Sequence, residues 1–182
     1  MNIRKTDRLS KTSRQLIIFH IFIYSKVIEL IEIKKIIEVS TKTIMRDLKE
    51  LQYAGLLNIK FTKKENGYIH IDDNKRCPFS APILSDNKAK NLHLQKLIRI
   101  STIMIELRNF TELHMYENHN KEQETCSSWY KNRFPSLSKR TMQRDFNELN
   151  KIGYEIKYDS YERNYIVEFP EGIEGIENNL LL

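Results

Sequence analysis

Apolar residues recur at helical spacing in two stretches of this chain, and a β-hairpin pattern follows each stretch. In the second stretch, Met142, Phe146 and Leu149 stand four and three residues apart, which places them on one face of a helix. Ser138 before them is a good N-cap, because its hydroxyl accepts from an unpaired N–H group of the first turn. Gly153 after them is a typical helix terminator. The pattern therefore predicts one amphipathic helix between Ser138 and Gly153.

Two short strands are predicted after this helix. Ile156 and Tyr158, and then Tyr165 and Val167, alternate with other residues as in a β-strand. Residues 159–164 between them are polar and are predicted to form the tip of a hairpin.

The same pattern occurs 98 residues earlier, where Ser40 stands in the place of Ser138 and Gly55 in the place of Gly153. A threonine, an Arg-Asp pair, a glutamate and a leucine recur in register between them. The apolar face of this first helix consists of Ile44, Leu48 and Leu51. Its hairpin is predicted at residues 57–61 and 68–71, around a polar tip at 63–67. Chance rarely reproduces both pattern and register, so the sequence predicts two copies of one module.

The helix-and-hairpin segments resemble the winged helix-turn-helix of DeoR-type and WYL-domain bacterial transcription regulators. The residues that carry the resemblance are STKTIMRD at 40–47 and SKRTMQRD at 138–145, and the second is the closer match. The resemblance covers most of residues 14–71 and, less continuously, 92–167. The chain departs from the family at Glu38, where the family often has glycine, and no sensor domain of the WYL or sugar-binding type follows.

The repeat and the resemblance together imply an α+β fold, mostly α, made of two tandem winged helix-turn-helix modules with three helices and a β-hairpin wing each. The further helices are predicted at residues 16–24, 31–37, 88–108 (capped by Asp86) and 125–134 (ended by Pro135). The expected organisation is a basic flexible arm at 1–13, module one at 14–71, a linker at 72–87, module two at 88–168 with an insertion at 109–124, and a tail at 169–182.

The charge of the chain agrees with a polyanionic partner. Among 182 residues there are 30 Lys and Arg against 24 Asp and Glu, a net charge of +6. The excess lies in residues 1–87, where 16 Lys and Arg face 10 Asp and Glu, whereas residues 88–182 have 14 of each. A basic half of this kind suits nucleic acid. Charge alone also fits an ordinary soluble protein, so it supports the pattern without replacing it.

The compartment is predicted from the cysteines and the apolar stretches. Cys77 and Cys126 are the only cysteines, too few for a disulfide framework and compatible with a reducing cytoplasm. The apolar stretch at residues 16–24 is interrupted by His20 and is too short to span a bilayer. We therefore expect a cytoplasmic, nucleoid-associated protein without a membrane segment.

The chemistry needed to read duplex DNA is present on the polar faces of the two repeated helices. Arginine forks onto guanine, amides fork onto adenine, and hydroxyl and lysine groups contact phosphate. The candidate DNA-binding residues are Ser40, Thr41, Lys42, Thr43, Arg46 and Lys49 in the first helix, Ser138, Lys139, Arg140, Thr141, Gln143, Arg144 and Asn147 in the second, and Lys63, Lys64 and Arg163 at the hairpin tips. Asp47 and Asp145 would repel phosphate, so we expect them to orient the adjacent arginine or to bond within the fold.

Other chemistries find little support in the sequence. His114, Glu117, His119 and Cys126 match no zinc-site spacing, and a polar loop accounts for the first three better. Trp129 and Tyr130 are expected in the core of module two. No glycine-rich phosphate loop, nucleophile elbow or paired-carboxylate motif occurs. We therefore expect neither an enzyme nor a cofactor or metal.

Three functions remain open at this stage. The first is a sequence-specific regulator of transcription that binds double-stranded DNA with two recognition helices. The second is a plasmid or phage replication initiator, since such proteins also pair two winged helices. The third is an adaptor that uses winged helices to bind a protein partner, because a fold does not determine a function. Candidate homodimer contacts are the predicted helix near residues 94–107 and the apolar end at 180–182.

Overall fold

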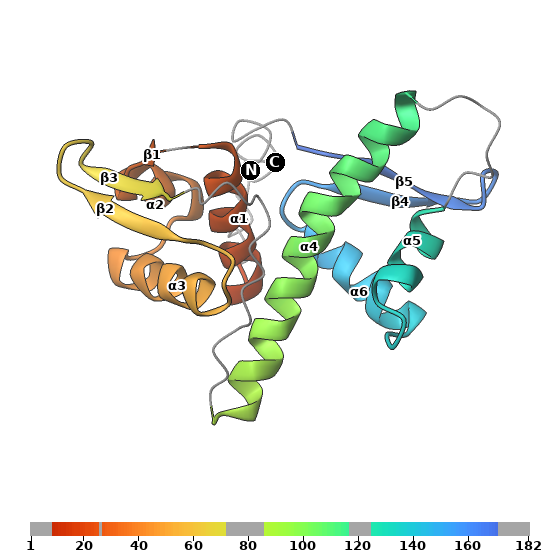
Figure 1. The fold of residues 1–182 in the computed structure, drawn as a ribbon, viewed down its shortest axis with the longest axis horizontal. Coiled ribbons are helices and arrows are strands. Elements are labelled where there is room, and N and C mark those ends of the chain that lie inside the picture. The colour runs from red at the N-terminus through yellow and green to blue at the C-terminus, as the bar shows by residue number, and fades with distance from the viewer. Residues whose placement is uncertain (1–8, 26, 72–85, 117–124, 171–182) are drawn as a thin grey trace, which may run out of the picture. The chain divides into compact units, whose positions relative to one another are not determined.

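The structure is a computed structural model that describes residues 9–25, 27–71, 86–116 and 125–170, with side chains for all of these except 108–116. Residues 1–8 of the predicted arm, 72–85 of the linker, 117–124 of the insertion and 171–182 of the tail lie outside the described residues. The described part is α+β and mostly helical (Figure 1). The chain divides into two compact units, Met1–Leu94 and Gln95–Leu182.

Unit 1 contains three helices and a small antiparallel sheet. Its elements are α1 (Lys11–Tyr24), β1 (Val27–Ile28), α2 (Leu30–Ile37), α3 (Thr41–Tyr53), β2 (Ile59–Thr62) and β3 (Gly67–His70). The strand order is β1-β3-β2, with Val27 paired to Ile69 and Phe61 paired to Tyr68. The strand β1 was not predicted, because two residues are too few to show a strand periodicity. A Cβ atom on Gly67 would lie 2.9 Å from the carbonyl oxygen of Ile28, so the absence of a side chain permits this close approach.

Helix α1 begins earlier than the sequence pattern predicted. The Ser10 hydroxyl accepts from the Ser13 N–H group at 3.0 Å, which caps the helix and starts it at Lys11. The predicted flexible arm at residues 1–13 is therefore too long at its C-terminal end. Leu16 to Ile18, Ile21 and Phe22 are almost fully buried, which confirms the prediction of a buried first helix.

The turn between α2 and α3 explains the departure noted at Glu38. Helix α2 begins with a reciprocal capping box between Glu29 and Glu32. It ends at Glu38, whose φ of 45° places a residue with a Cβ in the left-handed region. Ser40 then caps α3 as predicted, and Gly55 beyond its end has a φ of 71°.

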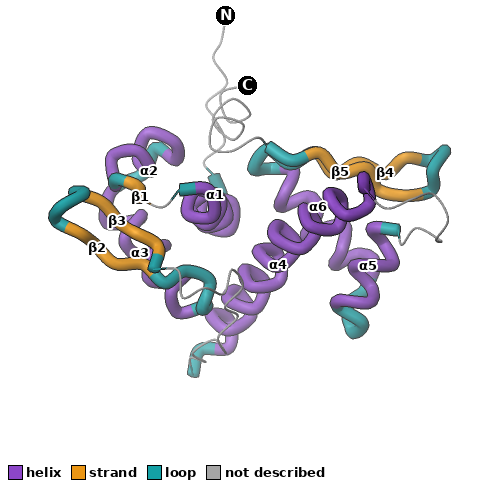
Figure 2. Tube along the Cα trace, turned by 45° about the horizontal axis from the view of Figure 1, so that its top comes forward, coloured by secondary structure: helices purple, strands orange, loops and turns teal. Residues whose placement is uncertain are grey.

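Unit 2 has a similar element order without a counterpart of β1 among its described residues. Its elements are α4 (Lys88–Tyr116), α5 (Cys126–Arg133), α6 (Lys139–Asn150), β4 (Glu155–Asp159) and β5 (Asn164–Glu168). Strands β4 and β5 form a two-stranded antiparallel hairpin. Figure 2 shows the strands of unit 1 (β1, β2 and β3) and of unit 2 (β4 and β5) in orange, and the helices in purple. The described helices and antiparallel strands are compatible with a winged-helix-like fold.

Helix α4 differs from its prediction at both ends. Its first-turn N–H group on Lys90 donates to the Asn87 side chain at 3.1 Å, so Asn87 caps the helix where Asp86 was expected. The helix continues to Tyr116, so residues 109–116 of the predicted loop-like insertion are helical. Its first turns, up to Leu94, belong to unit 1.

The first turns of α4 contact side chains of α1 and α3, in keeping with their place in unit 1. His93 Nε2 lies 2.7 Å from Gln15 Oε1, and the Lys90 ammonium lies 4.8 Å from the centre of the Tyr53 ring. Module two was expected to begin at residue 88, whereas the first seven residues of α4, Lys88 to Leu94, pack as part of unit 1.

The core of unit 2 forms around the predicted apolar face of α6. Met142, Phe146 and Leu149 are buried, as are the corresponding Ile44, Leu48 and Leu51 of unit 1. Tyr130 is buried as expected, and its ring contacts those of Phe134 and Phe146, whereas Trp129 is only half-buried. Of the residues predicted inward on α4, Leu94, Leu97, Met104 and Leu107 are buried and Ile98 is half-buried; Ile100 and Ile103 are buried in addition.

Candidate nucleic-acid interface

Helices α3 and α6 begin with the same hydrogen-bonded cap. The Ser40 hydroxyl accepts from the Thr43 N–H group at 3.3 Å, and the Ser138 hydroxyl accepts from the Thr141 N–H group at 3.2 Å. The hydroxyls within each Ser–Thr pair lie 3.0 Å and 3.1 Å apart. Each threonine therefore belongs to the cap, which leaves it half-buried rather than fully presented to solvent.

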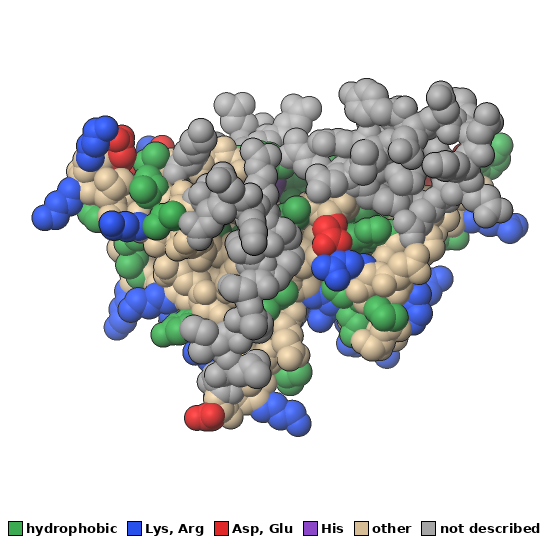
Figure 3. All heavy atoms as spheres, in the orientation of Figure 1, with side chains coloured by type: hydrophobic (Ala, Val, Ile, Leu, Met, Phe, Trp, Pro, Cys, Tyr) green, Lys and Arg blue, Asp and Glu red, His purple; other side chains and the backbone are tan. Residues whose placement is uncertain are grey.

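The other candidate residues of these helices are exposed. They are Ser40, Thr41, Lys42, Arg46 and Lys49 on α3, and Ser138, Lys139, Arg140, Gln143, Arg144 and Asn147 on α6. The hairpin-tip candidates Lys63, Lys64 and Arg163 are exposed as well. Figure 3 shows Lys and Arg side chains projecting around the α3 and β2–β3 elements of unit 1 and around the α5 and α6 elements of unit 2. Each predicted set therefore lies on the solvent-facing side of its own unit.

A pair of ionic contacts holds α3 against α1 in unit 1. Arg14 donates from Nε to Asp47 Oδ2 at 2.7 Å and from Nη2 to Oδ1 at 3.3 Å. Three residues earlier on α1, the Lys11 ammonium donates to Glu50 Oε1 at 2.8 Å. Gln15 Nε2 bridges both acidic side chains, at 3.3 Å from Asp47 and 2.6 Å from Glu50. Asp47 is fully buried, so its charge is compensated inside the fold.

The same contacts recur in unit 2 between α4 and α6. Arg99 donates from Nε to Asp145 Oδ2 at 2.6 Å and from Nη2 to Oδ1 at 2.8 Å. Three residues earlier on α4, the Lys96 ammonium lies 3.3 Å from Glu148 Oε1. The Tyr130 hydroxyl on α5 donates to Asp145 Oδ2 at 2.7 Å, as Gln15 does to Asp47 in unit 1. We call the two sets of contacts the helix clasps.

In each helix clasp, the aspartate of the Arg-Asp pair bonds to an arginine of an earlier helix. Both aspartates bond within the fold, one of the two outcomes expected, and neither engages the arginine beside it. Within the described part of the chain, the guanidinium groups of Arg46 and Arg144 make no hydrogen bond or ion pair, so both remain available to a ligand. Burial of the aspartate and exposure of its neighbour follow from one helix geometry, since adjacent residues lie ~100° apart.

The charge states of the clasps follow from their hydrogen bonds. The bond to Asp145 raises the pKa of Arg99 and outweighs the opposing effect of burial, so the guanidinium stays charged. Burial raises the pKa of Glu50, but hydrogen bonds from Lys11 and Gln15 and the charges of Lys11 and His93 outweigh it and lower the pKa overall. Both shifts favour the charged form of the side chain, the guanidinium of Arg99 in unit 2 and the carboxylate of Glu50 in unit 1.

Sequence reasoning did not find the helix clasps, although a signal was present. Lys11 and Arg14 share the Lys-x-x-Arg spacing of Lys96 and Arg99. These two pairs are 85 residues apart, whereas the helices that they hold repeat after 98 residues. An alignment at one fixed shift therefore places the basic pairs out of register.

Each hairpin runs back alongside its helix. In unit 1, Gln52 Nε2 donates to the Ile59 carbonyl at 3.3 Å near the end of α3, and the Tyr68 hydroxyl donates to Met45 Sδ at 3.1 Å near its start. In unit 2, Asn150 at the end of α6 fixes the start of β4, because its side chain donates to the Ile156 carbonyl and accepts from the Ile156 N–H group. The ring of Phe146, one turn earlier, contacts that of Tyr165 on β5 at 5.1 Å.

A cross-strand aromatic pair stiffens both hairpins at equivalent positions. Phe61 and Tyr68 have ring centroids 5.4 Å apart at an interplanar angle of 66°, and Tyr158 and Tyr165 have centroids 5.2 Å apart at 69°. Each pair is directly opposed in its ladder. Edge-to-face pairs of this kind stabilise the pairing of the two strands. Each hairpin is therefore held in one conformation beside its helix.

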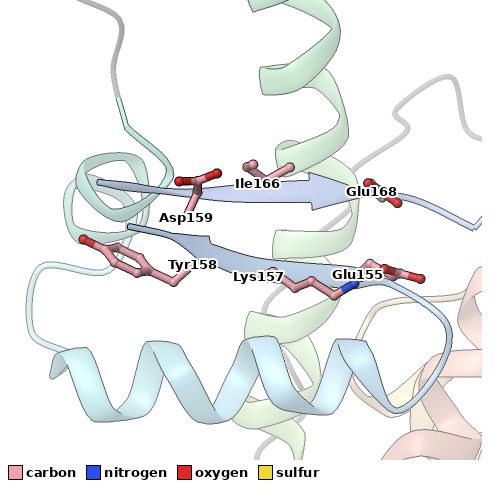
Figure 4. Close-up of a pocket in the computed structure, with 6 residues that line it drawn as sticks. All are labelled: Glu155, Lys157, Tyr158, Asp159, Ile166 and Glu168. Atoms are coloured by element: carbon pink, nitrogen blue, oxygen red, sulfur yellow. Dashed lines mark hydrogen bonds and ion pairs between the residues drawn. The ribbon is translucent and has the colours of Figure 1, made fainter. Parts of the chain in front are cut away.

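The outer face of the β4–β5 hairpin has a different character. It contains a hollow of about 230 Å³ lined by Glu155, Lys157, Tyr158, Asp159, Ile166 and Glu168 (Figure 4). The lining includes three carboxylates and one lysine, and the Lys157 ammonium contacts Glu155, which raises the pKa of Lys157. The hollow is therefore unsuited to phosphate, in contrast to the exposed basic side chains of α6 and of the hairpin tip.

Neither a metal-binding cluster nor a membrane-spanning helix occurs among the described residues. No group of three or more His, Cys, Asp or Glu side chains that could hold a metal ion occurs in the described residues. His114 has no described side chain, and Glu117 and His119 lie outside the described residues, while Cys126 is buried at the start of α5. Across the described ranges, no helix is long and apolar enough to cross a membrane.

No protein-family model, curated protein or solved structure matches this chain.

Proposed function

We propose that this protein is a sequence-specific double-stranded-DNA-binding regulator of transcription, built from two tandem winged helix-turn-helix modules. The observation that carries the proposal is the repeated arrangement of a capped helix, a clasp and a hairpin. In each unit the arginine of the Arg-Asp pair faces solvent, while the aspartate is bonded to the preceding helix. A helix held in this way presents its side chains in fixed positions, as reading of base edges requires.

The exposed side chains on both helices fit the chemistry of the major groove. Arg46 and Arg144 occupy the same place in the repeat and are suited to bidentate contacts with guanine. Asn147, the counterpart of Lys49, is suited to adenine. The two modules would therefore prefer different sequences, and one chain would recognise an asymmetric site.

The hairpins supply the sequence-independent part of binding in this proposal. Lys63 and Lys64 at the tip of the first hairpin are exposed and positioned on a stiffened arm. Contacts with phosphate raise affinity for all duplexes alike and make it depend on salt.

The test is the selection of duplexes by the full chain from a random library, followed by affinity measurements at several salt concentrations. We expect one enriched sequence and a steep negative slope of log K against log salt. Lys63→Ala and Lys64→Ala should reduce this slope. Lys60→Ala is the matched control, because Lys60 is an exposed lysine away from the hairpin tip, which β2 presents on the opposite face from Phe61. A flat salt dependence with no enriched sequence would exclude the proposal.

A further inference from the structure

The two hairpins reverse direction through turns of the same length. The β2–β3 ladder closes on the pair Thr62 and Gly67, and the β4–β5 ladder closes on the pair Asp159 and Asn164. Four residues lie in each turn. The residues of one turn therefore correspond one for one to those of the other.

The backbone of the turns supports this correspondence. The fourth turn residue has a positive φ in both, 49° at Asn66 and 51° at Arg163. Under this alignment the second turn residue is Lys64 in the first hairpin and Tyr161 in the second. One position thus holds a cation in unit 1 and an aromatic ring in unit 2.

Tyr161 is the most exposed large hydrophobic side chain of the described residues, with 90% of its surface in contact with solvent. The turn that carries it is well ordered, because Asp159 Oδ1 accepts from the N–H groups of Tyr161 at 2.7 Å and Glu162 at 3.1 Å. An aromatic ring that stays in water buries almost no apolar surface, so Tyr161 contributes little to the stability of the fold. Such a ring is well suited to binding, since aromatic side chains lose few rotamers on contact.

The position of the turn restricts what the ring can meet. Asn150 fixes the beginning of β4 at the end of α6, and the Phe146–Tyr165 contact lies one turn closer to the start of that helix. The hairpin therefore runs back towards the start of α6, and Figure 4 shows Tyr158 and Asp159 at that end of the hairpin. Arg140 on the first turn of α6 is exposed at the same end of the helix.

We propose that Tyr161 stacks on a nucleobase of the bound duplex, at a base step that is partly unstacked in the complex. The inference rests on the proposed function. Every base offers a π face, and base–aromatic stacking needs no phosphate contact. Apolar wedges at a base step are also a known way to exploit deformable DNA. The neighbouring Arg163, which is exposed in the same turn, then contacts phosphate.

The inference assigns different tasks to the two hairpin tips. Lys64 acts through charge, so its removal lowers the salt dependence of binding. Tyr161 acts through stacking, so its removal lowers affinity at every salt concentration without changing the slope. Sequence selectivity at the contacted step comes from the ease with which that step opens, as at flexible pyrimidine–purine steps.

The experiment compares Tyr161→Ala, Tyr161→Phe and Lys64→Ala in the full chain on the duplex selected by the wild-type protein. We expect Tyr161→Ala to weaken binding roughly 5- to 100-fold with an unchanged salt slope, and Tyr161→Phe to bind almost like wild type. The wild-type protein should also bind more tightly, by several-fold, to a duplex with a single mismatch at the contacted step, because unstacking is then easier. Tyr161→Ala should lose that preference.

A direct readout accompanies the affinities. The duplex is substituted with 5-iodouracil at successive positions and irradiated, and the cross-linked peptide is sequenced. A cross-link at Tyr161 supports the inference. Full affinity of Tyr161→Ala, or a loss that appears only as a changed salt slope, overturns it. Absence of duplex binding by the wild-type protein overturns the proposed function as well, so the two failures are distinguishable. Full DNA affinity with loss of a bound protein would instead make Tyr161 a protein contact.

Discussion

Arg99 donates two hydrogen bonds to Asp145, from Nε to Oδ2 at 2.6 Å and from Nη2 to Oδ1 at 2.8 Å. Asp145 is almost completely buried, so removal of the arginine would leave a buried carboxylate without its counter-charge. The pair therefore joins the first helix of unit 2 to α6 and sets the side of α6 that remains exposed. The equivalent pair in unit 1 is Arg14 and Asp47.

We expect Asp145→Asn to destabilise unit 2 by about 2–4 kcal/mol, because the substitution leaves the partly buried Arg99 without its counter-charge. The measurement is urea unfolding followed by Trp129 fluorescence. Trp129 is the only tryptophan of the chain and lies in α5 against Tyr130, so it reports on unit 2.

Arg133→Gln provides the matched control for this substitution. Its ion pair with Glu106 is half exposed, and pairs of that kind contribute only about 0–1 kcal/mol. A shift for Asp145→Asn no larger than that of the control would show that the clasp does not hold α6.

Arg46→Ala and Arg144→Ala should each weaken binding to the selected duplex by about 1–3 kcal/mol and relax preference in different halves of the footprint. The reason is that each arginine is exposed on its own helix and has no partner within the described residues. Footprinting with single-base variants of the duplex measures the two effects separately.

The control for charge loss is Lys157→Ala, which removes one positive charge from the acidic face of the β4–β5 hairpin. It should leave affinity nearly unchanged. If one arginine variant abolishes binding and the other has no effect, only one unit reads DNA.

Glu38→Gly should stabilise the protein by about 0.5–1 kcal/mol. Glu38 has a φ of 45° at the end of α2, and glycine adopts this left-handed conformation without a steric penalty. Thermal unfolding followed by circular dichroism at 222 nm measures the gain. Lys35→Gly is the control, since Lys35 is an exposed residue inside the same helix and its replacement should destabilise by a similar amount. Equal losses for both variants would contradict strain at Glu38.

Alkaline pH should weaken unit 2 through Cys126. Burial raises the pKa of this thiol from 9.0 to about 12, so the folded state retains the proton that the unfolded state loses above pH 9. The stability contributed by the neutral thiol is complete below pH 9 and declines as the pH rises towards 12. We expect the urea midpoint from Trp129 fluorescence to fall over this range and the fall to begin at higher pH in Cys126→Ala.

A fall that remains in Cys126→Ala is expected above pH 10, because burial and the bond to Asp145 also raise the pKa of Tyr130. Identical pH profiles for the variant and the wild-type protein would rule out a contribution from Cys126.

The apolar faces and the helix boundaries show which features local sequence can predict. Met142, Phe146 and Leu149 are buried as their spacing indicated, and Ser138 caps α6 as predicted. Hydrophobic spacing and capping act within a few residues, so they can be read without knowledge of the fold. The predicted cap of α4, Asp86, was wrong. Aspartate and asparagine are both good capping residues, and only the helix geometry selects Asn87.

The sequence by itself determined the two repeated helices, their hairpins and the exposed basic side chains on them, because each depends on residues close together in the chain. The tertiary structure decided that Asp47 and Asp145 turn inward, since their partners Arg14 and Arg99 are 33 and 46 residues away. It also decided that Lys64 and Tyr161 occupy equivalent places, because a turn is defined by the register of its two strands. Long-range pairing and strand register depend on how the chain folds back on itself, and local periodicity does not encode either.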